Sequence, residues 1–166
     1  RTNGTVVCIG DNSNGECNVP TGLKGVVQVA AGYYFTLALK SDGTVVGWGY
    51  NGHGDVTGGA GHTRIVSLST DWFSTIALKS DGTVAAWGDN SYGSSNVPVG
   101  LSNVVQIAKG GYFSVALQAN GNIVCWGRND VNQSEPPYGW QGAYQIALGG
   151  RDNHAERFAD ILKADG

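Results

Sequence analysis

The sequence has no methionine, only 4 prolines among its 166 residues and little charge, at 14% Asp, Glu, Lys and Arg. No stretch approaches the roughly 20 consecutive apolar residues of a membrane helix, and no basic region followed by an apolar run opens the chain. We therefore expect neither a membrane span nor an uncleaved signal peptide. Lys and Arg number 10 against 13 Asp and Glu, and they form no cluster, so binding to nucleic acid is not expected.

Glycine is the residue in excess. Its 27 occurrences are about 16% of the chain, against a usual share of about 7%, and the few prolines argue against a collagen or a linker. A turn-rich β protein is the natural interpretation, and a mass of 17.3 kDa suits one domain. Because the chain starts at Arg1 and has no methionine, we expect it to be processed, trimmed or part of something longer.

A repeat of 39 residues organises the chain. Gly-Thr-Val-Val at residues 4–7 returns at 43–46, and related segments begin at Gly82 and Gly121. Val-Val-Gln-Val-Ala at 26–30 has counterparts at 65–69, 104–108 and 143–147. The sequence therefore predicts one repeat domain, residues 1–166, with units at 4–42, 43–81, 82–120 and 121–166. The last unit is longer, and its extra residues lie within 151–158.

Each unit shows the alternation of β-strands. Apolar runs at 36–40 and 44–48 flank Ser41-Asp42-Gly43, and an Asp-Gly or Asn-Gly pair between such runs predicts a hairpin, because both turn residues must accept a positive φ. No segment keeps a helical pattern for three turns. One unit is a small sheet that cannot cover its own apolar faces, so copies must stack. The period and the Trp-Gly ending favour an all-β fold, a β-propeller with four blades in this chain.

One pattern is distinctive. Residues 103–117 read Asn-Val-Val-Gln-Ile-Ala-x-Gly-Gly-Tyr-Phe-Ser-x-Ala-Leu, and residues 120–127 read Asn-Gly-Asn-Ile-Val-Cys-Trp-Gly. This pattern resembles the repeat of the regulator-of-chromosome-condensation β-propeller family. Residues 87–98 look most like its short-repeat bacterial branch, which includes a propeller-type protein inhibitor of β-lactamase. The resemblance covers nearly the whole chain and implies a propeller.

The number of blades stays open at this point. Members of that family generally close seven blades, whereas this chain supplies four. A four-blade ring, pairing with another copy in a homo-oligomer, and membership of a larger propeller are the three alternatives. Nucleotide exchange, the activity of the family's namesake, is not expected because the chain has about half the blades and no basic tail.

Aromatic residues gather in the turn between the first two strands of each unit. Turns of stacked units should lie at one end, where aromatic side chains bury large area at little rotamer cost. In the inhibitor that the chain resembles, the corresponding turns contact the partner protein. The predicted partner-binding residues are Tyr33, Tyr34, Phe35, Trp72, Phe73, Tyr112 and Phe113, with Arg151, Asp152, Asn153, His154, Glu156 and Arg157 from the charged insertion of the fourth unit. Packing between blades is the alternative for the recurring Tyr34, Phe73 and Tyr112.

Other recurring residues favour structural roles. Trp48, Trp87 and Trp126 share one position of the repeat and are expected in the core. Cys8 and Cys125 occupy a position of the repeat that small residues hold elsewhere. A disulfide between Cys8 and Cys17 is possible, but a count of three cysteines leaves one thiol over and does not show whether this pair forms. No catalytic motif is present, and the three histidines have no ligands at metal-binding spacing, so we expect no enzyme activity, cofactor or metal.

The sequence predicts a non-catalytic module that binds a protein partner through aromatic loops on one face of the propeller. Two alternatives remain open: a lectin-like module that binds glycans, and a structural subunit that assembles with itself. The low charge and the many Asn, Gly and Ser turns suit a secreted or surface protein.

Overall fold

The computed structural model describes residues 4–130, 132, 134–135, 142–150 and 157–163. These residues form eleven β-strands and no helix, so the prediction of an all-β fold is confirmed. No helix that could cross a membrane occurs in this part of the chain.

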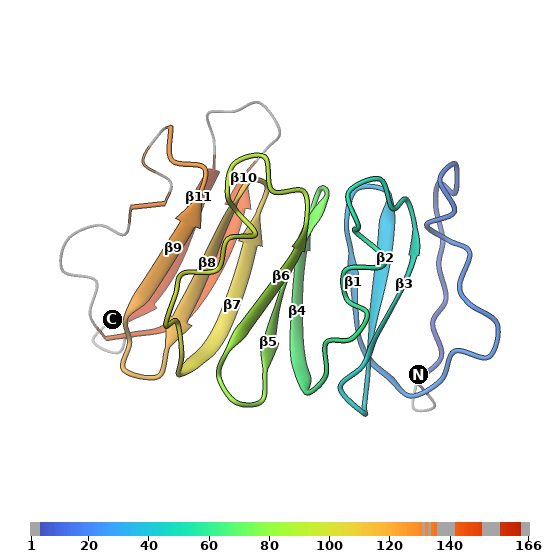
Figure 1. The fold of residues 1–166 in the computed structure, drawn as a ribbon, viewed down its shortest axis with the longest axis horizontal. Helices are drawn as coiled ribbons and strands as arrows, with labels where there is room; N and C mark the ends of the chain where they lie inside the picture. Colours follow the sequence, from blue (N-terminus) through green and yellow to red (C-terminus); the bar gives the residue numbers. More distant parts are fainter. Residues whose placement is uncertain (1–3, 131, 133, 136–141, 151–156, 164–166) are drawn as a thin grey trace.

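The strands group into four antiparallel sheets that follow the repeat. Three sheets have the orders β1-β2-β3, β4-β5-β6 and β7-β8-β9, and β10 pairs with β11 in the fourth. Figure 1 shows the sheets side by side in a row, with the N-terminus at one end and the C-terminus near the other. The strands are β1 (Val26–Ala31), β2 (Phe35–Lys40), β3 (Val45–Gly49), β4 (Ile65–Asp71), β5 (Ser74–Lys79), β6 (Val84–Gly88), β7 (Val104–Gly110), β8 (Phe113–Gln118), β9 (Ile123–Gly127), β10 (Ala143–Gly150) and β11 (Arg157–Lys163).

The Asp-Gly turns form the predicted hairpins. Between β2 and β3, the Lys40 N–H donates to the Thr44 carbonyl at 2.9 Å, and Gly43 has a φ of 78°. The Asp42 carboxylate accepts from the Thr44 N–H at 3.0 Å. Asp81 and Asn120 accept in the same way in the next two units. The turn chemistry thus fixes the register of the second and third strands of each unit.

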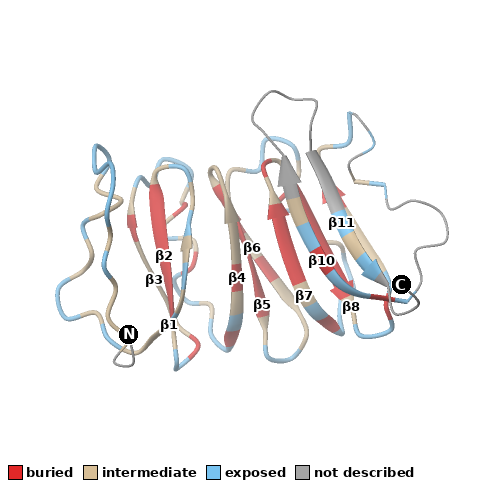
Figure 2. Ribbon diagram, turned by 180° about the vertical axis from the view of Figure 1, so that it is seen from behind, coloured by how far each residue is buried: buried red, intermediate tan, exposed pale blue. Residues whose placement is uncertain are grey.

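The middle strand of each three-stranded sheet lies deepest. Five of the six residues in each of β2, β5 and β8 are buried. The sheets of β5 and β8 have a neighbouring sheet on each side, whereas the sheet of β2 has one only on the side of β4. Between the first two sheets, Leu37 and Leu39 pack in one cluster with Ile65 and Leu68. In Figure 2 the buried residues run along the sheets, whereas the segment before β1 is intermediate or exposed. The core therefore sits between sheets, as a propeller requires.

The recurring tryptophans lie in this core, as predicted. Trp48, Trp87 and Trp126 are 6–7% exposed. Their indole N–H groups donate to the carbonyls of Glu16, Asp55 and Ser94 at 2.7, 3.0 and 2.9 Å. Each bond fixes the loop that precedes the sheet and satisfies a polar group that burial would otherwise make costly.

Glutamine side chains clamp successive sheets together. The Gln28 side chain donates to the Leu68 carbonyl at 2.8 Å and accepts from the Leu68 N–H at 2.9 Å. Gln106 makes the same two bonds to Ile146, at 2.8 and 2.9 Å. A primary amide matches the donor and acceptor of a peptide unit, so the first strand of one sheet binds the first strand of the next.

The cysteines fall into two classes. Cys8 and Cys17 form a disulfide, with their Cα atoms 5.2 Å apart, which settles the pairing that the sequence left open. Cys125 is a half-buried free thiol, and burial raises its pKa to about 11. A thiol with this pKa stays protonated near neutral pH and is a poor nucleophile.

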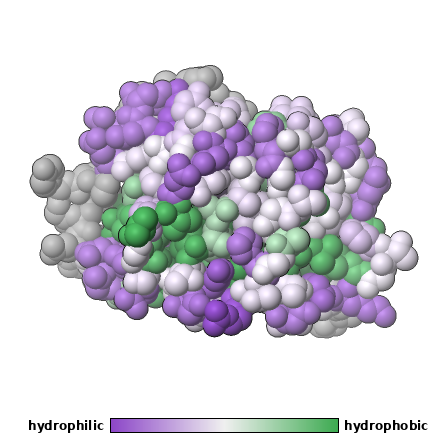
Figure 3. Space-filling model, viewed as in Figure 1, coloured by the Kyte–Doolittle hydropathy of each residue, from purple (hydrophilic) through white to green (hydrophobic). Residues whose placement is uncertain are grey.

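The face shown in Figure 3 is mostly covered by hydrophilic residues and residues of intermediate hydropathy. Figure 3 shows strongly hydrophobic residues on limited areas of the displayed face, the largest of them toward the left and right of the view. The residues that the structure describes hold no group of three or more His, Cys, Asp or Glu that could bind a metal ion.

Candidate functional site

In each of the three three-stranded sheets, two loops meet at the same end of the sheet. The Tyr50 N–H, just after β3, donates to the carbonyl of Tyr34 in the turn before β2 at 2.8 Å. The second and third sheets repeat this bond between Asp89 and Phe73 at 2.7 Å and between Arg128 and Tyr112 at 2.9 Å. The turn between the first two strands and the loop after the third strand therefore build one surface.

Aromatic rings cover this surface without interruption across three sheets. We call it the aromatic face and define it as Tyr33, Tyr34, Tyr50, His53, Trp72, Phe73, Tyr92 and Tyr112. The ring centroids of Tyr33 and Trp72 are 6.3 Å apart, those of Trp72 and Tyr112 are 5.4 Å apart, and those of Tyr112 and Tyr92 are 4.6 Å apart. At the far side the Arg128 guanidinium lies 5.0 Å from the Tyr92 ring.

Phe73 joins the rings that lie in the first turn of the first sheet and in the loop after β3. Its centroid lies 5.8 Å from that of Tyr33, 5.9 Å from that of Tyr50 and 5.2 Å from that of His53. Tyr33 and Tyr34 are 4.2 Å apart, and the hydrogen bond between their side chains raises the pKa of Tyr34. Contacts of this kind hold each ring in place before any ligand arrives.

Several of these rings remain open to solvent. Tyr33 is 55% exposed, Tyr92 is 47% exposed and Tyr50 is 36% exposed. Tyr34, Trp72, Phe73 and Tyr112 are half-buried. The face is thus a packed layer whose outer surface is available to a partner.

The backbone at Trp72 is strained. Its φ of 26° lies in the region that favours glycine, and the corresponding residue of the third unit is Gly111, with a φ of 39°. The Asp71 carboxylate accepts from the Trp72 N–H at 2.8 Å and also from the Gly111 N–H. A strained backbone persists only where its surroundings determine it, and such strain often occurs at binding sites.

Two of the predicted residues lie in the core instead. Phe35 and Phe113 are 1% and 0% exposed. Phe35 begins β2 and points with Leu37 and Leu39 into the cluster between the first two sheets, and Phe113 takes the equivalent place in β8. Alternation along a strand puts these side chains between sheets, so they support the aromatic face from below.

The charged insertion is placed only in part. Arg151, Asp152, Asn153, His154 and Glu156 lie outside the described residues. For Arg157 the structure describes the backbone alone, which begins β11 and pairs with Gly150.

Sequence reasoning missed Tyr50, His53, Tyr92 and Arg128. All four lie in the loops after third strands, and an up-down-up order of strands already returns these loops to the end that carries the first turn. That topological rule was the signal that could have found them.

A buried carboxyl group lies beneath this face. Asp55 is fully buried, its Oδ2 accepts from the His53 N–H at 3.1 Å, and its Oδ1 has no hydrogen-bond partner among the described residues. Removal from water raises the pKa of Asp55. In the third unit the same position is Ser94, so the carboxyl group is not required by the fold.

The stacked three-stranded sheets and their shared loop end define the chain as part of a β-propeller. The family model of the "Regulator of chromosome condensation (RCC1) repeat" matches residues 26–55, 65–94 and 104–133, which hold the first three sheets and the loops that follow them. The chain belongs to this RCC1 repeat family.

Solved structures share the fold. Prp20p from Saccharomyces cerevisiae aligns with a TM-score of 0.61 at 19% identity, over 75% of this chain and 41% of Prp20p. Human WBSCR16 aligns with a TM-score of 0.59 at 20% identity, over 93% of this chain and 46% of WBSCR16. The ectodomain of the receptor kinase CR4 from Physcomitrella patens aligns with a TM-score of 0.58 at 23% identity, over 82% of this chain and 41% of the ectodomain.

The chain therefore spans less than half the length of these neighbours. A search of curated protein sequences gives no match.

Proposed function

We propose that this chain is a non-catalytic module that binds a protein partner through the aromatic face. The observation that carries the proposal is the unbroken series of ring contacts from Tyr34 to Tyr92 across three sheets, with Tyr33, Tyr50 and Tyr92 open to solvent. Tyr and Trp dominate the energetic centres of protein interfaces because they bury large area and lose little rotamer freedom.

Preorganisation supports the same function. The turns that carry Tyr33 and Trp72 are joined by a backbone hydrogen bond of 2.9 Å, and Asp71 holds the strained Trp72 backbone. Binding to a surface that is already ordered avoids much of the entropy cost of association. Affinity then comes from aromatic burial and a few backbone hydrogen bonds rather than from charge.

Structural neighbours supply a second argument. Prp20p has binding properties to Gsp1p and histones, and Kap60 has been seen bound to yeast RCC1 (Prp20). Protein recognition is thus an activity that this fold supports elsewhere. The finer proposal is that the chain acts like the inhibitor of the short-repeat bacterial branch, whose corresponding turns contact its partner.

A secreted or cell-surface location fits this proposal. The Cys8–Cys17 disulfide forms and persists in oxidising compartments, whereas cytosolic thiols are kept reduced. The partner would then be a protein of the same compartment.

The test uses the immobilised chain, a Tyr33→Ala variant, a Trp72→Ala variant and a Tyr144→Ala control. Tyr144 is also an exposed tyrosine, at 56%, but it lies on β10 outside the aromatic face. We expect a partner to bind the original chain and the control alike, and each alanine variant to weaken binding by more than about 1 kcal/mol.

Equal binding to all four proteins would contradict the proposal. A glycan panel run in parallel addresses the lectin alternative: a glycan whose binding needs Tyr33 and Trp72, with no protein partner retained, would replace protein recognition by glycan recognition.

A further inference from the structure

The first sheet exposes a residue that every other sheet buries. Val29 is 47% exposed, whereas its counterparts Leu68, Ile107 and Ile146 are 4%, 7% and 2% exposed. In those three positions the preceding sheet covers the side chain. The outer surface of β1 is therefore one half of an inter-sheet contact.

The fourth sheet exposes the other half of such an inter-sheet contact. Leu162 pairs with Gln145 as Leu39 pairs with Gln28, so Leu162 and Leu39 are equivalent. Leu162 is 47% exposed, whereas Leu39, Leu78 and Leu117 are 1%, 6% and 1% exposed.

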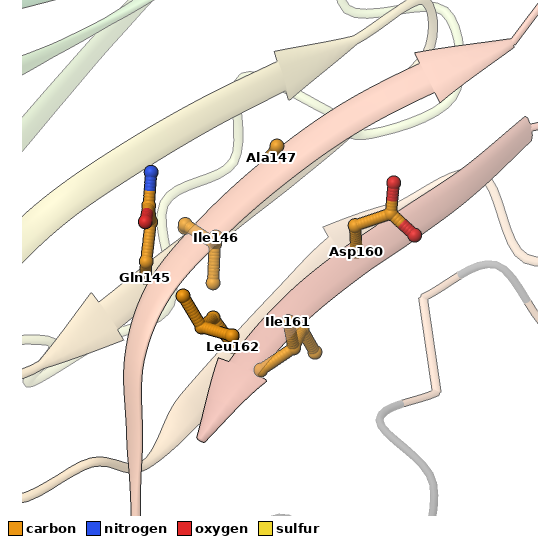
Figure 4. A pocket seen from close by; sticks show the side chains of 6 residues that line it. All are labelled: Gln145, Ile146, Ala147, Asp160, Ile161 and Leu162. Carbon is orange, nitrogen blue, oxygen red and sulfur yellow. The ribbon is translucent and has the colours of Figure 1, made fainter. Parts of the chain in front are cut away.

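A hollow of about 290 Å³ lies on this sheet. Figure 4 shows Gln145 and Leu162 on neighbouring strands at its edge. Gln145 is exposed, whereas its counterparts Gln28 and Gln106 clamp the next sheet.

The segment that corresponds to the missing third strand of the fourth sheet lies at the other end of the chain, at residues 6–10, which form no strand in a single copy. Residues 6–10 match β3, β6 and β9 in the repeat. Ile9 is 94% exposed, whereas Trp48, Trp87 and Trp126 at the same position are 6–7% exposed. Within the described residues β11 pairs with β10 alone, so its second edge is open. An open strand edge and an exposed apolar segment with the repeat position of a strand are complementary surfaces.

We propose that β10 and β11 of one copy dock onto a second copy, between its residues 6–10 and its β1. The junction repeats the interior register: Leu162 lies opposite Val6 of the second copy, as Leu39 lies opposite Val45. Gln145 makes two hydrogen bonds to the backbone of Val29 in the second copy, as Gln28 does to Leu68. One docking event thus covers Val29, Gln145 and Leu162.

The disulfide holds the accepting segment, residues 6–10, in place. Cys8 corresponds to Gly47, and a Cβ on Gly47 would lie 3.0 Å from Val56, the counterpart of Cys17. The Cys8–Cys17 bond is a covalent version of this interior contact. Residues 6–10 are therefore held close to their blade position before the second copy arrives, which lowers the entropy cost of docking.

The occupant is a second copy because the two surfaces lie at opposite ends of one molecule, as Figure 1 shows. Two copies of this 166-residue chain make two equal junctions, so that each open surface is covered by its counterpart on the other copy. A pair closed in this way leaves no open edge, whereas the single copy leaves one.

The test compares solution mass across a dilution series. We expect the chain to show twice 17.3 kDa, and Leu162→Lys and Val29→Glu each to show one copy, because each puts a charge into both junctions. Val105→Lys is the matched control, since Val105 is 55% exposed and its counterparts Val27 and Val66 are exposed too. Gln145→Ala removes only the clamp, and we expect it to raise the dissociation constant about tenfold.

Mixing makes the test specific to this geometry. An equimolar mixture of Leu162→Lys and Val29→Glu has one junction with opposite charges and one unchanged junction, so we expect it to regain the mass of two copies. Circular dichroism checks that each variant is folded. A single-copy mass for the original chain, masses above two copies, or a mixture that stays at one copy would each overturn the proposal.

Discussion

The backbone N–H of Tyr33 donates to the carbonyl oxygen of Trp72 across the first two sheets, at 2.9 Å. Trp72 is the residue whose φ of 26° is strained, so the bond ties the strained turn to its neighbour. The rings of the same two residues are 6.3 Å apart. Backbone and side chains of these turns thus act together to hold the aromatic face in one arrangement.

The strain at Trp72 predicts an inverted order of stability for two variants. Trp72→Ala keeps a Cβ at a positive φ, whereas Trp72→Gly removes it, so we expect the glycine variant to be more stable than the alanine variant by about 1 kcal/mol. Thermal or denaturant unfolding measures the difference. Thr75, in β5, lies outside the strained region, and Thr75→Ala and Thr75→Gly give the ordinary order in which alanine is better. An alanine variant that equals or exceeds the glycine variant at position 72 would show that the strain is absent.

The buried Asp55 predicts a stability that rises when the carboxyl group is replaced. Its pKa is raised by desolvation, so the charged form destabilises the folded state above that pKa, and the penalty disappears as the pH falls below the unfolded value of 3.8. Asp55→Ser, which copies Ser94, also removes the unsatisfied Oδ1. We expect a gain of about 1 kcal/mol near pH 7 that shrinks toward pH 4, measured by unfolding at several pH values.

Asp42 provides a control of opposite sign. Hydrogen bonds from Lys40 and Thr44 lower the pKa of this exposed carboxyl group, so its contribution is present above pH 3.8 and is lost as the pH falls through the lower folded value. Asp42→Ser should therefore reduce stability at pH 7. If both variants changed stability in the same direction at pH 7, burial would not be the cause of the Asp55 effect.

The glutamine clamp predicts a large effect from a half-buried polar residue. Gln28→Ala leaves the N–H and carbonyl of Leu68 without their partners, and we expect a loss of about 1–3 kcal/mol in the free energy of unfolding. Val27→Ala, one residue away and 65% exposed, should change it by less than about 0.5 kcal/mol. Equal effects at the two positions would mean that the clamp contributes nothing beyond a surface side chain.

Repetition made the fold predictable. The 39-residue period, the Asp-Gly turns and the recurring tryptophans each depend on local chemistry that the sequence shows four times or nearly so, and the strands formed within a residue or two of their predicted ends. The direction of the strands alone was enough to predict that Tyr33 and Trp72 lie at the same end of their sheets.

The remaining features depend on contacts that no local pattern encodes. Phe35 stands beside Tyr34 in the sequence, and only the register of β2 decides that one ring is buried and the other half-buried. Strand order returns the loops of Tyr50 and Tyr92 to the end that carries the first turn, but the direction of each ring depends on the irregular backbone of its loop. The Cys8–Cys17 bond needed the distance between two segments, which a count of three cysteines cannot supply.

Asp160 predicts how tightly two copies associate. It occupies the position of Leu37, Ile76 and Val115, which are fully buried in the interior sheets. Docking of β11 would bury this carboxylate, and burying a charge is costly, so the junction between copies should be weaker than the interfaces within one. We expect Asp160→Leu to lower the dissociation constant of the dimer at least tenfold, measured by the dilution at which the mass falls to one copy. Asp130→Leu, at an exposed position outside the junction, serves as the control. A dissociation constant that Asp160→Leu leaves unchanged would place β11 outside the interface, because a buried carboxylate cannot be neutral in its effect on association.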